Sequence, residues 1–228
     1  MKKLILSFFA FGIISSGISQ AVSDRNTIPV AVNLNRVLRM SINTGGNLEF
    51  TFNTINQYKN GISGDQAAST SQGTVAANPM YRTTFTVSSS TDWLLEYGAE
   101  DATLQGVDDP TKTLTLDNVG FSLSSVNNGA GGHDFTGGAG GGDLTLQSLI
   151  TTHGTTIAAL TAYPTTLIEK NAQADAAGSN AGDASDNSFQ MIWRIGTAEG
   201  TMNAVKLIEA NATPDRYVTN VLFNLQAQ

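Results

Sequence analysis

Two histidines are the first side chains of this sequence to consider for chemistry. His133 and His153 are the only histidines in the chain. A metal site or a catalytic triad would need them close to each other and to a carboxylate. His133 is followed by Asp134 inside a glycine-rich run, but adjacency alone specifies no geometry. We therefore assign neither histidine a catalytic or metal-binding role.

A polar loop late in the chain carries oxygen atoms that suit calcium. Asp175, Asp183 and Asp186, with Asn180 and Asn187, offer carboxylate and amide oxygens, and Ca²⁺ takes six to eight oxygen ligands. The sequence has neither the EF-hand spacing nor the aspartate-containing nonapeptide of calcium-binding β-helices. The three aspartates are calcium candidates, but we favour a solvated acidic loop and predict no other cofactor.

Nucleophilic catalysis has no recognisable basis in the sequence. Cysteine is absent, and no serine stands in a Gly-x-Ser-x-Gly pattern. A glycosidase would need two carboxylates across a cleft, whereas the acidic residues lie mostly at expected turns. We therefore predict that the protein is not an enzyme and keep a secreted hydrolase only as a third hypothesis.

Aromatic residues raise the alternative of a carbohydrate-binding module, because sugar rings stack on exposed aromatic faces. The candidates are Tyr81, Trp93, Tyr97, Trp193 and Tyr217. All five lie on segments in which every second residue is apolar, and core aromatics occupy such positions. We favour core positions for them. A glycan remains the alternative partner, with residues 60–78 and 171–187 as the loops that would form its site.

The first residues have the layout of a secretory signal peptide. Two lysines precede the apolar run Leu4–Ile14, and Ser19–Ala21 is a small-residue cleavage site. A membrane-spanning helix needs about 20 apolar residues, and no run of that length follows. We predict a signal peptide over residues 1–21 and one domain over residues 22–228, with no membrane-spanning segment in the mature chain.

Charge and cysteine content narrow the partners and the compartment. The chain has 19 acidic and 12 basic side chains, a net charge of −7, and no basic cluster. Nucleic acid is therefore not an expected partner. An exported chain without cysteine relies on hydrogen-bonded sheet and core packing rather than on disulfides. This combination favours the surface, the periplasm or the exterior of a Gram-negative bacterium.

Alternating apolar residues predict an all-β fold. The last stretch, Asp215–Leu225, places Tyr217, Val221 and Phe223 on one face of a strand. Similar patterns predict strands at Thr27–Ile42, Leu48–Phe52, Tyr81–Val87, Trp93–Tyr97, Leu114–Leu116, Val119–Leu123 and Phe189–Ile195. Weaker patterns predict a small edge strand at Thr165–Ile168 and a strand at Val205–Ile208. Short, regularly spaced strands are typical of a β-sandwich.

Turn residues and polar runs complete the predicted layout. The polar turn Ser88–Asp92 predicts a hairpin between the strands on either side of it, with Trp93 at the centre of the core. Long loops are expected at Asn60–Asn78, Gly129–Gly142 and Asn171–Asn187. The spacing in Leu144–Leu160 fits one short helix as well as it fits a strand.

Taken in order, several of these segments resemble one group of exported proteins. They read VLRMSI, GGNLEFTF, YRTTFTVSSSTDWLLEY, LTLDNVGFSLSS and YVTNVLFNL. This order resembles secreted Ig-like β-sandwich proteins of Bacteroidetes-type bacteria and, more distantly, fimbrial and spore-coat-U-like domains. The resemblance implies an Ig-like antiparallel β-sandwich that acts as an extracellular or cell-surface structural subunit. The chain lacks the cysteine pair common in the chaperone-usher type, which argues against that assembly pathway.

The resemblance also implies a mechanical mode of action. We expect a structural or adhesive subunit, fimbria-like, that assembles by edge-strand pairing, with self-association or other surface proteins as its partners. The segment Val22–Leu34 is a candidate to donate a strand to a neighbouring subunit, since it is partly apolar and free at one end. We favour its other role, as the first strand of its own sandwich.

Overall fold

The structure is a computed structural model and describes residues 28–65, 79–126, 146–148, 157–170, 179–210 and 212–228. The chain divides into an N-terminal unit that ends at Leu34 and a body, Asn35–Gln228. All the strands and helices of the described residues belong to the body.

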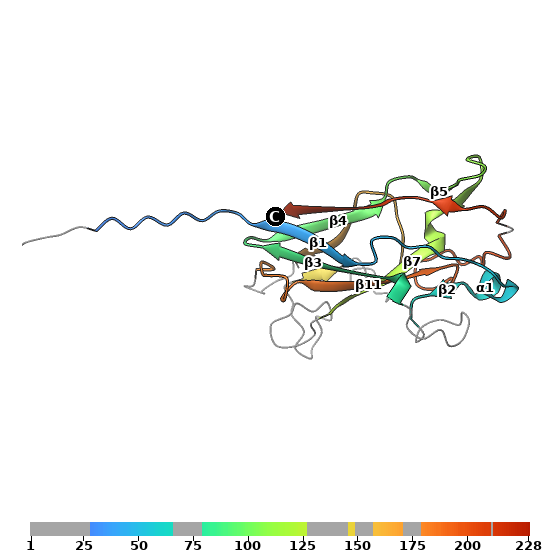
Figure 1. Cartoon of the computed structure of the whole chain (residues 1–228), viewed down its shortest axis with the longest axis horizontal. Helices are drawn as coiled ribbons and strands as arrows, with labels where there is room; N and C mark the ends of the chain where they lie inside the picture. The colour runs from blue at the N-terminus through green and yellow to red at the C-terminus, as the bar shows by residue number, and fades with distance from the viewer. Residues whose placement is uncertain (1–27, 66–78, 127–145, 149–156, 171–178, 211) are drawn as a thin grey trace, which may run out of the picture. The chain divides into compact units, whose positions relative to one another are not determined.

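Three antiparallel sheets form the body (Figure 1). The strands of the first sheet lie in the order β1 (Leu38–Thr44), β3 (Arg82–Ser89), β11 (Ser188–Ile195), β7 (Val119–Ser125) and β9 (Ala158–Ala159), and β2 (Ile62–Ser63) also pairs with β11. The second sheet has the order β13 (Val221–Ala227), β4 (Trp93–Ala99), β10 (Thr165–Lys170) and β8 (Leu146–Ser148). The third has the order β12 (Tyr217–Val218), β5 (Thr103–Gly106) and β6 (Thr113–Thr115).

Aromatic side chains join the first two sheets face to face. The ring centroids of Phe85 on β3 and Phe223 on β13 lie 5.9 Å apart. Those of Tyr97 on β4 and Phe121 on β7 lie 5.2 Å apart. Trp93 on β4 meets Phe189 on β11 edge to face at 6.0 Å. Because these pairs connect different sheets, the predicted antiparallel β-sandwich is confirmed.

The predicted hairpin at Ser88–Asp92 is wrong, although both of its strands exist. β3 pairs with β1 and β11 in the first sheet, whereas β4 pairs with β13 and β10 in the second. The turn therefore carries the chain from one sheet to the other. Alternation identified the faces of both strands, since Phe85, Val87, Trp93 and Leu95 are buried, but it did not identify their partners.

The first strand is shorter than predicted. Residues 28–37 belong to no strand, and β1 begins at Leu38 and ends at Thr44. The prediction that Val22–Leu34 forms the first strand of its own sandwich is therefore wrong for residues 28–34. Residues 22–27 lie outside the described part of the chain.

A short helix, α1 (Ile55–Asn60), ends at the first residue of the predicted loop Asn60–Asn78, and the strand β2 lies within that loop. Thr54 and Gln57 form a capping box, in which the Thr54 hydroxyl accepts from the Gln57 N–H and the Gln57 amide oxygen accepts from the Thr54 N–H. The Thr-x-x-Gln spacing was a readable signal for this helix. Residues 66–78 lie outside the described part of the chain.

Four further predictions have mixed outcomes. Leu144–Leu160 contributes the strands β8 and β9, so the described part of this segment follows the strand alternative. Thr165–Ile168 forms part of β10, which lies inside its sheet between β4 and β8 and is not an edge strand. Val205–Ile208 forms turns instead of a strand, and Leu114–Leu116 is split between β6 and a 3-10 turn, η2 (Leu116–Asn118).

A second 3-10 turn, η1 (Pro79–Tyr81), precedes β3. Of the helices in the described residues, none is long and apolar enough to cross a membrane.

Candidate functional site: an apolar groove beside an unpaired segment

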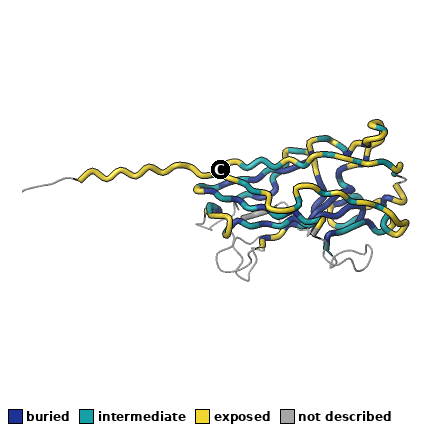
Figure 2. Tube along the Cα trace, in the orientation of Figure 1, coloured by how far each residue is buried: buried dark blue, intermediate teal, exposed yellow. Residues whose placement is uncertain are grey.

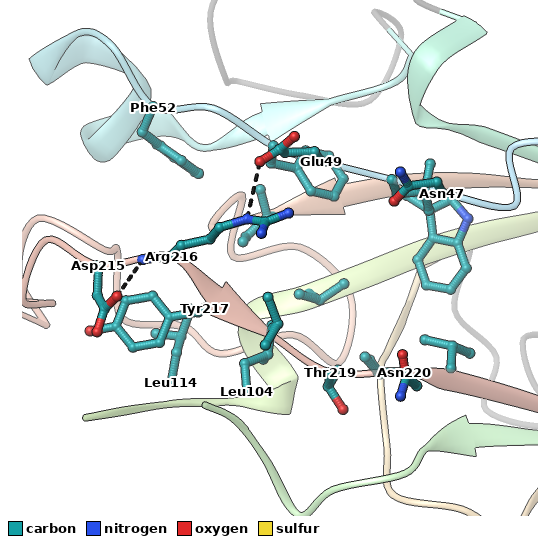
Figure 3. A pocket seen from close by; sticks show the side chains of 18 of the residues that line it. Asn47, Glu49, Phe52, Leu104, Leu114, Asp215, Arg216, Tyr217, Thr219 and Asn220 are labelled. Carbon is teal, nitrogen blue, oxygen red and sulfur yellow. Dashed lines mark hydrogen bonds and ion pairs between the residues drawn. The ribbon is translucent and has the colours of Figure 1, made fainter. Parts of the chain in front are cut away.

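A groove of about 520 Å³ opens between two stretches of the body that are far apart in sequence (Figure 3). One wall is formed by residues 45–52, which follow β1, and the other by residues 212–223, which include β12 and the start of β13. This volume lies within the range of about 300–1,000 Å³ that is usual for ligand pockets.

The first wall has the side-chain pattern of a strand but no strand partner. Leu48, Phe50 and Phe52 are half-buried and pack against the core, while Asn47, Glu49 and Thr51 are exposed. Within the described residues, the backbone of residues 46–52 makes no hydrogen bond to other backbone groups. The predicted strand at Leu48–Phe52 therefore has the alternating side-chain burial of a strand but not its ladder of backbone hydrogen bonds to another described segment.

Gly45 sets the start of this wall. Its φ of +69° lies in the left-handed region, and a Cβ there would stand 1.8 Å from the backbone oxygen of Arg82. The Thr83 hydroxyl donates to the Gly45 carbonyl at 2.8 Å. Only glycine allows the chain to turn this close to β3, so Gly45 fixes where residues 46–52 leave the sheet.

The second wall is held by Asp215. The backbone N–H groups of Asp108 and Asp109 each donate to its carboxylate at 3.1 Å. The hydrogen bond from Asp108 is the main cause that lowers the pKa of Asp215 below its ordinary value, because it favours the charged form. The ionised carboxylate ties the chain before β12 to the turn after β5.

The floor of the groove is the hydrophobic core itself. Leu104, Leu114, Val119, Trp193 and Leu207 line it, and each of them is buried. The Trp193 indole N–H donates to the hydroxyl of Thr83 at 2.9 Å, so this polar atom of the floor is satisfied. An apolar side chain entering the groove would therefore meet apolar core surface.

One ion pair joins the two walls at the mouth. Glu49 Oε1 lies 3.4 Å from Arg216 Nε, and the two side chains are 63% and 67% exposed. Figure 3 shows this pair reaching from one wall to the other. Exposed pairs of this kind contribute about 0–1 kcal/mol. The pair can open at little cost and does not seal the groove.

The calcium candidates form no metal site in the described residues. Asp183 accepts from the N–H groups of Ser185 and Asp186 at 2.7 and 3.2 Å, and Asp186 accepts from the N–H of Asp183 at 3.0 Å. The two carboxylates thus close their own turn. Asp175 lies outside the described residues, and the residues inside them include no group of three or more His, Asp or Glu side chains placed to hold a metal ion.

The amides of the same loop have another role. Asn180 is fully buried, and its side chain accepts from the backbone N–H of Trp93 at 3.0 Å and donates to the Trp93 carbonyl at 2.8 Å. Asn187 is also fully buried and donates to the Asn180 carbonyl at 3.4 Å. The Asn180 amide therefore fastens the loop to the start of β4, and the Asn187 amide binds a backbone group within the loop. His133 and His153 lie outside the described residues.

Three of the five aromatic candidates for sugar binding are buried. Trp93, Tyr97 and Trp193 are at most 3% exposed, as the alternation predicted. Burial raises the pKa of the Tyr97 phenol to about 12. Tyr81 and Tyr217 are half-buried, and Tyr81 stacks on Phe50 at 4.5 Å. Neither tryptophan offers a face on which a sugar ring could stack.

The groove itself was not predicted. Its residues were assigned to strands and turns, and no motif marks them as a site. Comparison of the chain with protein-family models and with curated proteins found no match. Function is therefore inferred from the geometry of the chain.

Proposed function

We propose that this chain is a non-enzymatic structural subunit, extracellular or at a cell surface, that assembles by strand pairing between copies. The observation that carries the proposal is a row of apolar side chains before β1. Ile28, Val30, Val32 and Leu34 are 83%, 83%, 74% and 91% exposed, and Figure 2 shows this stretch as exposed throughout. An exposed, continuous apolar row of this kind is typical of an interaction surface.

The backbone of the same stretch is unpaired. Residues 28–34 belong to no strand, and their N–H and C=O groups make no hydrogen bond to other described backbone groups. Addition to the edge of a sheet would satisfy the backbone and bury the apolar row in one step. Because a shift by one residue would turn the apolar row outward, the register of such pairing is well specified.

Export is the second part of the proposal. The basic and apolar residues at the start of the chain support a signal peptide over residues 1–21, and the acidic, cysteine-free composition supports a bacterial surface or periplasm. An adhesive role at that surface is compatible with the same assembly. These features together favour a fimbria-like subunit over a carbohydrate-binding module.

Substitution of one apolar residue by a charge tests the proposal. In the chain from residue 22 onward, Val32→Asp removes about 2 kcal/mol of apolar burial from the assembled state and adds a buried charge. A loss of about 3 kcal/mol corresponds to roughly a hundredfold weaker association. We expect sedimentation velocity to show concentration-dependent oligomers for the parent chain and monomers for Val32→Asp.

Asn33→Asp is the matched control. It introduces the same charge one residue away, on the opposite face of an extended segment. We expect it to assemble like the parent chain. The proposal fails if the parent chain stays monomeric at every concentration, or if Val32→Asp assembles as well as Asn33→Asp does. Circular dichroism should show the same folded body for all three proteins, because both residues are exposed.

A further inference from the structure

A strand that adds to this protein needs an edge that is free and apolar side-chain space beside that edge. Among the strands that the structure describes, β13 is an edge strand of its sheet and pairs only with β4. Residues 46–52 are unpaired along their backbone within the described residues. Both border the groove of about 520 Å³, whose floor is buried core. The groove thus combines free backbone groups with apolar space.

The segment Ile28–Leu34 has the complementary pattern. Its four apolar side chains stand at every second residue, so in an extended conformation they project to one face. Pro29, Ala31 and Asn33 project to the other face. The groove needs an apolar row on its floor side and small or polar residues on its solvent side, and this segment supplies both.

The position of the groove along β1 favours a second copy as the source of the segment. The segment joins the body at Asn35, before the first residue of β1, whereas residues 45–52 follow its last residue. The seven residues of β1 span about 23 Å at 3.3 Å per residue. The point of attachment and the acceptor groove therefore lie at opposite ends of the strand.

From these observations we propose that residues Ile28–Leu34 of one copy occupy the groove of the next. The segment pairs its backbone with residues 46–52 and places Ile28, Val30, Val32 and Leu34 against the apolar floor. The exposed pair Glu49–Arg216 opens as the segment enters. This inference rests on the proposed function and names the acceptor site within it.

A head-to-tail contact follows from this arrangement. Each copy would use one surface to donate and a different surface to accept, which is a heterologous interface. Heterologous contacts propagate into rings or filaments rather than closing as a two-fold dimer. The expected product is an open series of subunits, each completed by the segment of its neighbour.

Engineered disulfides test the acceptor directly, because the natural chain has no cysteine. One set of chains carries Ala31→Cys or Asn33→Cys, and the other carries Asn47→Cys, Glu49→Cys or Thr51→Cys. All five positions are exposed and lie on the expected solvent face of the pair. Mixing the two sets in all six combinations samples neighbouring registers. We expect at least one mixture to give a disulfide-linked heterodimer on a non-reducing gel, and Val32→Asp in the donor chain to abolish it.

The control replaces the acceptor cysteine by Ser124→Cys. Ser124 is exposed on β7 of the first sheet and does not line the groove, so no cross-link is expected. If the parent chain assembles but none of the six mixtures cross-links more than this control, the groove is not the acceptor and the proposed function still stands. A third kind of chain carries a donor and an acceptor cysteine together. If these two cysteines link only within that one chain, the segment fills its own groove and the inference is wrong. If the parent chain does not assemble, the proposed function fails.

Discussion

At the scale of single residues, Asn180 shows how a loop without large apolar residues is held to the sandwich. Its side-chain amide accepts from the backbone N–H of Trp93 and donates to the Trp93 backbone carbonyl. The backbone carbonyl of Asn180 accepts from the Trp93 indole N–H at 2.6 Å. Trp93 and Asn180 are both fully buried. The side chain of Asn180 thus takes the role of a neighbouring strand at the first residue of β4, where a ladder partner would otherwise be needed.

Asn180→Ala is expected to be strongly destabilising. The substitution leaves the N–H and the C=O of Trp93 buried without these partners, and each unsatisfied group costs about 1–3 kcal/mol. We expect urea denaturation, followed by tryptophan fluorescence, to show a loss of about 2–4 kcal/mol in the free energy of unfolding. Asn53→Ala is the control, since Asn53 is exposed, and it should change that free energy by less than about 0.5 kcal/mol. Equal effects of the two substitutions would contradict the role of Asn180.

At the scale of elements, the turn after β1 decides whether the groove has its first wall. Gly45 and Gly46 are adjacent but differ in their surroundings. A Cβ on Gly45 would meet the backbone of Arg82 at 1.8 Å, whereas a Cβ on Gly46 would come no closer than 4.0 Å to the side chain of Ile42. Gly45 alone of the two has a positive φ. The wall therefore depends on one glycine and not on its neighbour.

This difference gives a paired prediction. Gly45→Ala forces a left-handed alanine against the backbone of β3, and we expect it to lower the free energy of unfolding by about 1–3 kcal/mol. It should also shift residues 46–52 and weaken assembly. Gly46→Ala should alter stability by less than about 0.5 kcal/mol. Chemical denaturation and sedimentation velocity of the two variants side by side would check this, and identical behaviour would contradict the role given to Gly45.

The alternation of apolar residues along a strand predicts the face that is buried but not the strand that pairs with it. Alternation located β3, β4, β7 and β11 because it reports which residues face the core. The predicted last strand, Asp215–Leu225, is divided into β12, which pairs with β5, and β13, which pairs with β4. Alternation does not report which segment supplies the hydrogen bonds, so the hairpin between β3 and β4 was wrong. For the same reason Leu48–Phe52 was expected to be an ordinary strand.

The groove lay beyond prediction because its walls are far apart in sequence. Glu49 and Arg216 meet across its mouth, and nothing local in either stretch indicates the other. The apolar row Ile28–Leu34 is readable from the sequence as a strand pattern and as a candidate for donation to a neighbour. The sequence does not show that these side chains are exposed, because that depends on whether the core of the body includes them.

At the scale of the whole molecule, a sandwich with a continuous core presents two features that its own described residues do not use. One is the exposed apolar row Ile28–Leu34, and the other is the groove beside residues 46–52. A protein that remained a monomer would expose both to solvent at an energetic disadvantage. Head-to-tail assembly would bury both and would turn separate sandwiches into one continuous chain of subunits.

Electron microscopy of the chain from residue 22 onward, concentrated without detergent, tests this assembly most directly. We expect regular filaments one subunit wide for the parent chain and for Asn33→Asp, and separate small particles for Val32→Asp. A uniform field of single particles for the parent chain at every concentration would contradict self-assembly through the N-terminal segment.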